Sequence, residues 1–150
     1  MKVVIQRVSE AAVTINGSEH ARIGAGLLVL LGISTEDTEE DAQWLAQKVL
    51  GLRIFADEQG MMNRALEDIQ GSLLLISQFT LIASCRKGNR PSFIRAARPE
   101  QAIPLYEYFS VLLRASLGVR LATGVFGADM KVSMCNDGPV TILIDTQNKE

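Results

Sequence analysis

The sequence predicts a single α+β domain in which a mostly antiparallel, barrel-like β-sheet packs against two main helices. Its 150 residues suit one domain, and 47% of them are hydrophobic, which is enough to form a core. Apolar or alternating runs of strand length outnumber the helical patterns. The dipeptide Asn16-Gly17 between two such runs is typical of an antiparallel hairpin. We expect residues 1–146 to form the domain and residues 147–150 a polar tail.

The N-terminal part predicts strands over residues 3–8 and 11–15, with a return strand over 19–23 after the hairpin turn. Residues 26–33 are continuously apolar, which predicts a central strand buried on both faces. A helix then follows, with Thr35 or Asp37 as its expected N-cap and acidic residues near its start. Its apolar face carries five residues at helical spacing, namely Ala42, Leu45, Ala46, Val49 and Leu52.

The C-terminal part predicts strands over residues 52–55 and 73–81, and then a loop over 88–99. Because proline fits the first turn of a helix and not its interior, the second helix is expected to run from Pro104 to Leu117. Gly118 is a suitable residue to end it, and any turn that starts at Pro99 is expected to be separate. Three strands, over 120–125, 130–135 and 140–145, complete the domain.

The overall charge and the absence of metal-site motifs limit the classes of function. A net charge of −2 argues against a protein that grips long stretches of nucleic acid, but it allows contact with the end of an RNA. Cys85 and Cys135 form neither a disulfide framework nor a Cys/His metal cluster. The first seven residues are no signal peptide, and no apolar run is long enough to span a membrane. We therefore expect a cytoplasmic protein that uses no metal and no cofactor.

The usual catalytic motifs are missing from the sequence. His20, the single histidine, follows the hairpin turn and lacks the serine elbow that a catalytic triad would need. Neither cysteine has a histidine partner in the pattern, and neither a phosphate-binding loop nor a dinucleotide fingerprint is present. With these motifs excluded, any catalysis is expected to use backbone groups and hydroxyl side chains.

Three segments are unusual, and each has two interpretations. Ser-Gln-Phe-Thr-Leu at 77–81 ends an apolar strand; its hydroxyls either satisfy backbone groups at the strand edge or, with nearby N–H groups, line a site that stabilises an oxyanion. Asn-Asp-Gly-Pro-Val-Thr at 136–141 is either a plain turn or a functional loop with a cis Gly-Pro bond. Residues 86–98 contain five basic residues near Phe93, and they form either a solvated loop or a phosphate-binding patch.

Taken together, these segments resemble the D-aminoacyl-tRNA deacylase family, and the likeness runs nearly end to end. Several motifs in order at the family's spacing are far more specific than one. The motifs that carry the resemblance lie at residues 5–8, 26–32, 48–55, 62–63, 77–81, 87–93, 128–130 and 136–141. Residues 82–85 and 124–127 are not diagnostic, and they bear on the shape of the pocket.

The resemblance implies a homodimeric esterase that removes D-amino acids, and glycine mischarged on tRNA(Ala), from tRNA while rejecting L-aminoacyl-tRNA. It implies a catalytic wall formed by Ser77, Gln78, Phe79 and Thr80. It further implies that a cis Gly138-Pro139 pair reads chirality in the partner's site, with Arg7 holding that loop and Met130 taking part in selectivity. Contact with the tRNA acceptor end is expected from Lys87 and Arg90.

The mechanism leaves alternatives open. We expect the backbone N–H groups of Phe79 and Thr80 to form the oxyanion hole, and Thr80 to act as nucleophile or to position water. The terminal ribose hydroxyl of the tRNA is another source of assistance. Two other functions compete: a non-enzymatic nucleic-acid-binding protein of the same fold, and a hydrolase of free amino-acid esters.

Overall fold

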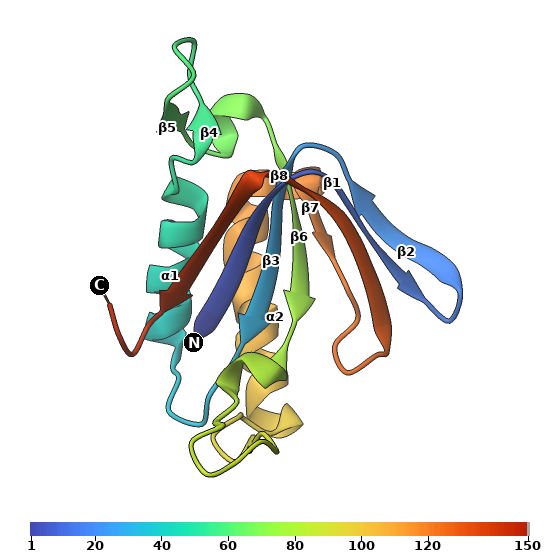
Figure 1. Ribbon diagram of the computed structural model, residues 1–150, viewed down its shortest axis with the longest axis vertical. Coiled ribbons are helices and arrows are strands. Elements are labelled where there is room, and N and C mark those ends of the chain that lie inside the picture. Colours follow the sequence, from blue (N-terminus) through green and yellow to red (C-terminus); the bar gives the residue numbers. More distant parts are fainter. Residues whose placement is uncertain (150) are drawn as a thin grey trace.

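A computed structural model describes residues 1–149 as a strongly curved six-stranded sheet with two long helices and a small hairpin (Figure 1). Both helices lie against the same side of the sheet, and the hairpin projects beyond one end of it. The elements are β1 (Lys2–Ile15), β2 (Ser18–Ile23), β3 (Gly26–Gly32), α1 (Glu39–Gly51), β4 (Phe55–Ala56), β5 (Met62–Arg64), β6 (Ser72–Ser77), α2 (Pro99–Leu117), β7 (Leu121–Thr123) and β8 (Met130–Asp145), with short 3-10 helices at Glu67–Ile69, Phe79–Ile82 and Gly118–Arg120.

The long strand β1 organises the sheet because it pairs with three others. Its first half pairs antiparallel with β3 on one edge, and its second half pairs with β2 through the turn at Asn16 and Gly17, both of which have positive φ. Strand β8 runs antiparallel along the other edge of β1 over nearly its whole length. Beyond β3 the pairing turns parallel through β6 and β7. The expected α+β class with mostly antiparallel pairing is therefore confirmed.

Two apolar clusters lie on the two faces of the sheet. Alternate residues of β1, β3 and β6, including Ile5 and Leu31, are buried against α1 and α2. The residues between them, including Leu28 and Leu74, face a second cluster enclosed by the curl of the sheet. This explains why the run of residues 26–32 is apolar throughout, because β3 is covered on both faces as predicted.

The N-cap of the first helix lies three residues beyond one expected cap and one residue beyond the other. Its N-cap is Thr38, whose N–H donates to the Asp41 carboxylate at 3.0 Å. Thr35 and Asp37 were both wrong as caps. The buried carboxylate of Asp37 instead accepts from the Ser34 N–H at 2.6 Å and pairs with the Met1 ammonium, so it is occupied by contacts that join β1 to this turn.

The second helix starts at Pro99 and continues through Pro104, so the prediction that it starts at Pro104 was wrong. Pro104 removes one hydrogen bond, to the carbonyl of Glu100, which is an exposed residue whose carbonyl water can reach. The flanking residues Ala102, Leu105 and Tyr106 are all buried against the sheet. Their packing outweighs the cost of about 3 kcal/mol that an interior proline carries.

Four expected strands also differ in length or continuity from the observed ones. The strand expected over 73–81 ends at Ser77, and residues 79–82 form a 3-10 helix. The strands expected at 130–135 and 140–145 are one element, β8, interrupted at residues 137–140, which have no backbone partner on β1. The strand expected over 120–125 is β7, which is only three residues long.

The C-terminal residues make contact with the rest of the domain. The Gln147 side chain donates to Asp37 at 3.2 Å, and the Lys149 ammonium lies 4.8 Å from the centre of the Trp44 ring. The tail therefore packs more than its polarity predicts; Glu150, its last residue, lies outside the described residues. Within residues 1–149 neither long helix is apolar enough to cross a lipid bilayer.

Candidate functional site

A cavity of about 310 Å³ opens where β3 and β6 end, and it gathers most of the expected catalytic wall. Ser77, Gln78 and Phe79 line it from the end of β6, and Met130 lines it from the start of β8. Its remaining walls come from the C-terminal end of β3, the end of β6, the region around the start of α2, and the loop before β8 with the start of β8. The residues are Leu31, Ile33, Ile76, Ala97, Ala102, Phe126, Gly127, Ala128, Asp129 and Val132. The cavity therefore combines an apolar floor with a polar edge, as small-molecule sites do.

The polar edge is fixed by the way β6 ends. The Gln78 N–H donates to the Leu31 carbonyl at 2.7 Å, which ties the chain to β3 before it turns into the 3-10 helix. Because the first N–H groups of a helix have no acceptor within it, those of Phe79 and Thr80 have no partner in the 3-10 helix that they begin. Gln78 Nε2 donates to the Thr80 hydroxyl oxygen. This hydroxyl therefore receives a hydrogen bond from an amide and has no contact with a basic side chain among the described residues.

Aromatic contacts support both sides of the cavity. The exposed ring of Phe79 meets Phe93 edge to face, with 5.1 Å between ring centres. On the opposite side Phe126 packs in the same way against Tyr106, at 5.7 Å. Burial raises the pKa of Tyr106 to about 12, and its hydroxyl donates to the Leu75 carbonyl at 3.3 Å. Tyr106 therefore stays neutral and supports the wall as a packed ring.

The expected chirality loop forms an extrusion of β8 at residues 137–140. The peptide bond between Gly138 and Pro139 is cis, as the resemblance implies. Arg7 holds this loop to the domain: its Nε donates to the Asp137 carbonyl at 3.0 Å, while Nη1 donates to the Ile54 carbonyl at 2.6 Å. A side chain at position 138 would approach Arg7 Nη2 to 3.0 Å and Val140 Cγ2 to 2.8 Å, so only glycine fits without a shift.

Within one chain the loop and the cavity lie at opposite ends of the sheet. Val8 of β1 pairs with Gly26 at the loop end, whereas Lys2 pairs with Gly32 beside the cavity. Six strand residues at about 3.3 Å each separate these ends by roughly 20 Å. Figure 1 shows the bend of β8 at the end opposite the loop that follows β6. The structure thus brings Arg7 to residues 138–139 and Met130 to residues 77–79, but leaves the two groups apart.

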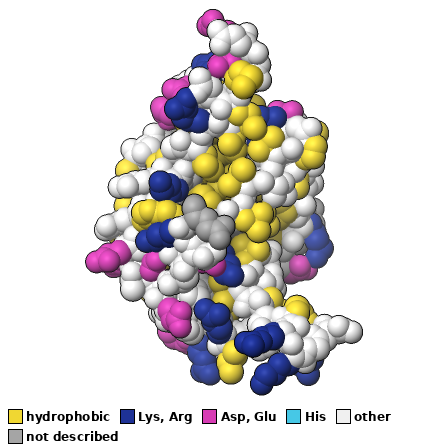
Figure 2. Space-filling model, turned by 60° about the vertical axis from the view of Figure 1, so that its left-hand side comes forward, with side chains coloured by type: hydrophobic (Ala, Val, Ile, Leu, Met, Phe, Trp, Pro, Cys, Tyr) yellow, Lys and Arg dark blue, Asp and Glu magenta, His cyan; other side chains and the backbone are white. Residues whose placement is uncertain are grey.

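The basic loop lies beyond the cavity, at the same end of the molecule. Lys87 and Arg90 are exposed, and Arg95 lies 3.7 Å from the Glu36 carboxylate. Figure 2 shows Lys and Arg side chains gathered at this end, while Asp and Glu are scattered over the rest of the visible face. The contact of Phe93 with Phe79 joins this loop directly to the polar edge of the cavity.

Gln6 had no predicted role, although it lies in the motif at residues 5–8. Its side chain is bonded to the base of the extruded loop, from the face opposite Arg7. The alternation of side chains along a strand was the available signal, since it places neighbours 6 and 7 on opposite faces. The described residues contain no cluster of His, Cys, Asp and Glu that could hold a metal ion.

Comparisons with known proteins agree on one family. The family model described as D-Tyr-tRNA(Tyr) deacylase matches residues 4–145. Proteins named D-aminoacyl-tRNA deacylase from Cytophaga hutchinsonii and Porphyromonas gingivalis are 61% and 59% identical to the chain, over the full length of both partners. A solved structure named c-Myc DNA Unwinding Element Binding Protein has a TM-score of 0.92 at 44% identity, over 97% of this chain and 98% of that one.

A more distant structure shares the fold alone. It is described as that of a probable eukaryotic D-amino acid tRNA deacylase, and it has a TM-score of 0.81 at 19% identity. The superposition covers 95% of this chain and 97% of that one, so the curved sheet and both helices are common to the two.

Proposed function

The chain belongs to the D-Tyr-tRNA(Tyr) deacylase family, and from this premise we propose that it is a hydrolase of the ester bond in D-aminoacyl-tRNA. The products are the free D-amino acid and tRNA, and glycyl-tRNA mischarged on tRNA(Ala) is a second substrate. The observation that carries this proposal is the cavity at the end of β6, which Ser77, Gln78 and Phe79 line; Thr80 does not line it but follows directly in the 3-10 helix.

The chemistry that fits this edge is electrostatic. The N–H groups of Phe79 and Thr80 would stabilise the oxyanion that forms when water attacks the ester carbonyl. Because the Thr80 oxygen accepts a hydrogen bond from the Gln78 amide, it is made less basic, and a role in positioning water suits it better than a role as nucleophile. The neighbouring ribose hydroxyl of the tRNA is the available source of further assistance. No step needs a metal or a cofactor.

Two copies of the chain are needed to complete the site. The 138–139 loop lies roughly 20 Å from its own cavity, so it can serve only the cavity of another copy. If two copies exchange loops symmetrically, their two-fold axis must pass midway between loop and cavity. Along β8 that midpoint lies between Thr141, beside the loop, and Asp145, which pairs with Lys2 at the cavity end. Leu143 stands there.

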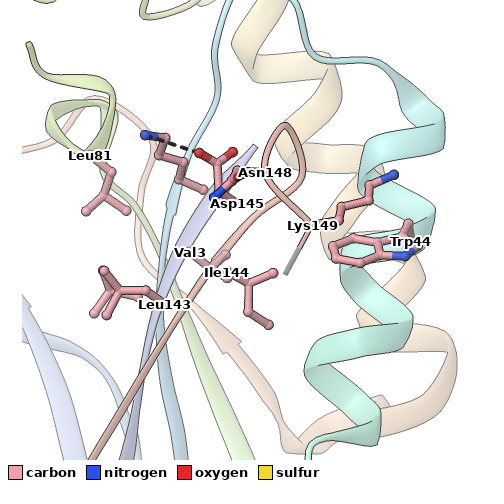
Figure 3. Close-up of a pocket in the computed structure, with 10 residues that line it drawn as sticks. Val3, Trp44, Leu81, Leu143, Ile144, Asp145, Asn148 and Lys149 are labelled. Carbon is pink, nitrogen blue, oxygen red and sulfur yellow. Dashed lines mark ion pairs between the residues drawn. The ribbon is translucent and has the colours of Figure 1, made fainter.

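The surface around that midpoint suits a self-complementary contact. Leu143 is 73% exposed, although it is a large apolar residue. It lies in a groove of about 400 Å³ together with Val4, Leu81 and Trp44, bordered by the Lys2–Asp145 ion pair at 3.3 Å (Figure 3). Figure 2 shows apolar side chains running down the middle of the face that it presents. An exposed apolar surface of this kind marks an interaction site, and we propose that a second copy covers it.

Selectivity would then come from the partner's loop. Main-chain carbonyl oxygens around Gly138 of the partner subunit would accept hydrogen bonds from the α-ammonium group of the substrate. With the ammonium group and the ester carbonyl both fixed, a D side chain points to solvent and an L side chain meets backbone. Glycine has no side chain to reject. Met130, which lines the cavity, would border this space.

Contact with tRNA is confined to one end of the molecule. Lys87 and Arg90 would neutralise phosphates of the acceptor end, and Phe93 would lie between that contact and the cavity. We place the protein in the cytoplasm, where charged tRNA is formed, and both cysteines are free thiols, which suits a reducing compartment.

Deacylation of D- and L-tyrosyl-tRNA, with D-tyrosine methyl ester as a third substrate, tests the activity. The proposal expects release of D-tyrosine from tRNA, slow release of L-tyrosine, and much slower turnover of the free ester. Equal rates on the ester and on charged tRNA would favour a small-molecule hydrolase. Salt-sensitive binding of nucleic acid without turnover would favour a binding protein, a function suggested by the name of the 44% identical structure.

Mixing two impaired variants tests the exchange of loops. Thr80→Ala changes only the cavity and Gly138→Ala only the loop, so a mixed dimer has one site in which both parts are intact. Random pairing should restore about a quarter of the wild-type specific activity. If each loop served its own chain, every site in the mixture would carry one defect, and no activity would return.

A further inference from the structure

We propose that Gln6 and Asn136 form a side-chain clamp that positions the 138–139 loop and thereby sets the discrimination between D- and L-aminoacyl-tRNA. The inference rests on the proposed function, and it assigns a positioning role to two residues on the face of the sheet opposite the two helices. They do not touch the substrate; they act through the loop that does.

The loop needs such a clamp because it lacks a backbone ladder. Between the pairs Gln6–Thr141 and Val8–Asn136, β1 advances by two residues and β8 by five. Residues 137–140 are therefore extruded, and no strand fixes their height above the sheet. Side chains must supply the hydrogen bonds that the ladder does not.

Asn136 closes the base of the loop from within. Its Oδ1 accepts from the Val140 N–H at 3.1 Å, which joins the two ends of the extruded segment. Its Nδ2 donates to Gln6 Oε1 at 2.5 Å and to the Thr141 hydroxyl at 3.4 Å. One amide thus links both ends of the loop to the neighbouring strand.

Gln6 anchors that amide to β1. Its Oε1 accepts from Asn136 Nδ2 and from the Thr141 hydroxyl, both at 2.5 Å, so two donors converge on one oxygen. The next residue, Arg7, holds the Asp137 carbonyl from the opposite face of the strand. Successive residues of β1 therefore hold the loop from both faces, and with Gln6 removed the Arg7 contact alone would act as a hinge.

The consequence falls on selectivity more than on folding. Gln6 and Asn136 are partly exposed. If their side chains are changed, water can form hydrogen bonds with the groups that they bind, so we expect little loss of folding stability. A loop that tilts about Arg7 would no longer fix the ammonium group while excluding an L side chain. D-tyrosyl-tRNA would then be cleaved more slowly and L-tyrosyl-tRNA faster.

The test compares Gln6→Leu and Asn136→Ala with the conservative variant Gln6→Glu, which keeps an acceptor for both donors. We expect each of the first two to lower the ratio of kcat/KM for D- over L-tyrosyl-tRNA about tenfold, the effect of losing one or two hydrogen bonds. Gln6→Glu should keep the wild-type ratio. Thr14→Val is the matched control, because Thr14 is another partly buried polar residue of β1 that pairs with β8.

The thermal midpoint, the two rates and their ratio together distinguish a positioning role for the clamp from a purely structural one. If Gln6→Leu and Asn136→Ala lower the thermal midpoint and both rates together while the ratio stays constant, the clamp is only structural and the inference is overturned. A wild-type protein without deacylase activity would instead overturn the proposed function.

If Gln6→Leu fails to fold, charge variants decide the matter. Asn136→Asp alone keeps the ratio, because a turned Gln6 amide can donate to the new carboxylate. The double variant Gln6→Glu/Asn136→Asp sets two carboxylates face to face and should lose the ratio. Additive effects in the double variant would overturn the inference.

Discussion

Leu143→Lys is the substitution that most directly tests whether a second copy covers the groove on β8. The side chain is 73% exposed in one chain, so the change costs little in the folding of that chain. At a symmetric contact near the two-fold axis, the same change removes two leucines and brings two ammonium groups close together. We expect a folded protein that dimerises poorly and has little deacylase activity at low concentration.

The magnitude follows from the exposed fraction. Full burial of a leucine contributes about 1.5–3 kcal/mol, and 73% of that amount is available here in each copy. For two copies the loss is roughly 2–4 kcal/mol before any repulsion between the charges. Since about 1.4 kcal/mol corresponds to a factor of ten, the dimer Kd should rise by a factor between tens and about a thousand.

Sedimentation velocity across a dilution series measures the Kd, and deacylation of D-tyrosyl-tRNA at the same concentrations measures activity. Activity should return as the variant is concentrated, in step with the dimer fraction. Val119→Lys is the control, because Val119 is fully exposed and lies in the 3-10 helix after α2, outside the groove. A Leu143→Lys protein that is monomeric and fully active would refute the exchange of loops.

Three further outcomes are expected. Burial raises the pKa of Tyr106 to about 12 from 10.0 for a free side chain, so the folded state holds its proton more tightly; about 3 kcal/mol of stability is lost as the pH rises from 10 through 12, and Tyr106→Phe should remove this dependence in urea titrations. Gly26→Ala would put Cβ 1.8 Å from the Ser72 carbonyl oxygen, so the free energy of unfolding should fall by at least about 3 kcal/mol. Lys87→Gln with Arg90→Gln should raise KM for charged tRNA and reduce the salt slope of log KM by about 0.7 for each phosphate that is no longer neutralised, whereas an unchanged slope would place the tRNA elsewhere.

The sequence predicted the strands and the first hairpin because their signals are local. Asn16 and Gly17 accept positive φ, and the continuous apolar run of β3 reflects cover on both faces. The start of α2 was missed because it depends on tertiary packing: Leu105 and Tyr106 are buried on the sheet, which stabilises a helix that Pro104 alone would disfavour. Local propensity is a weak guide where burial decides.

The site was only partly predictable for a related reason. Residues 77–80 and Arg7 were predicted as site residues from motifs, but nothing in the sequence shows that the cavity and the 138–139 loop lie at opposite ends of the sheet. That separation follows from the pairing of Lys2 with Gly32 and of Val8 with Gly26, a register that a single sequence does not reveal. The caps predicted at Thr35 and Asp37 were wrong for the same kind of reason, because Asp37 binds the distant Met1.

The length of β1 links the fold to the proposed chemistry. Strand β1 holds the loop near Gln6, and at its other end Lys2 pairs with Gly32 of β3 beside the cavity, so the loop and the cavity lie roughly 20 Å apart within one chain. Two copies related by a two-fold axis at the midpoint would bring each loop to the cavity of the other copy, which would give two complete sites from one contact. A monomer would keep the N–H groups of residues 79 and 80 and so could retain some ester hydrolysis, but it would lack the partner's loop that we propose reads handedness. Dissociation should therefore lower selectivity before it abolishes hydrolysis, and dilution of the Leu143→Lys variant allows that order to be measured.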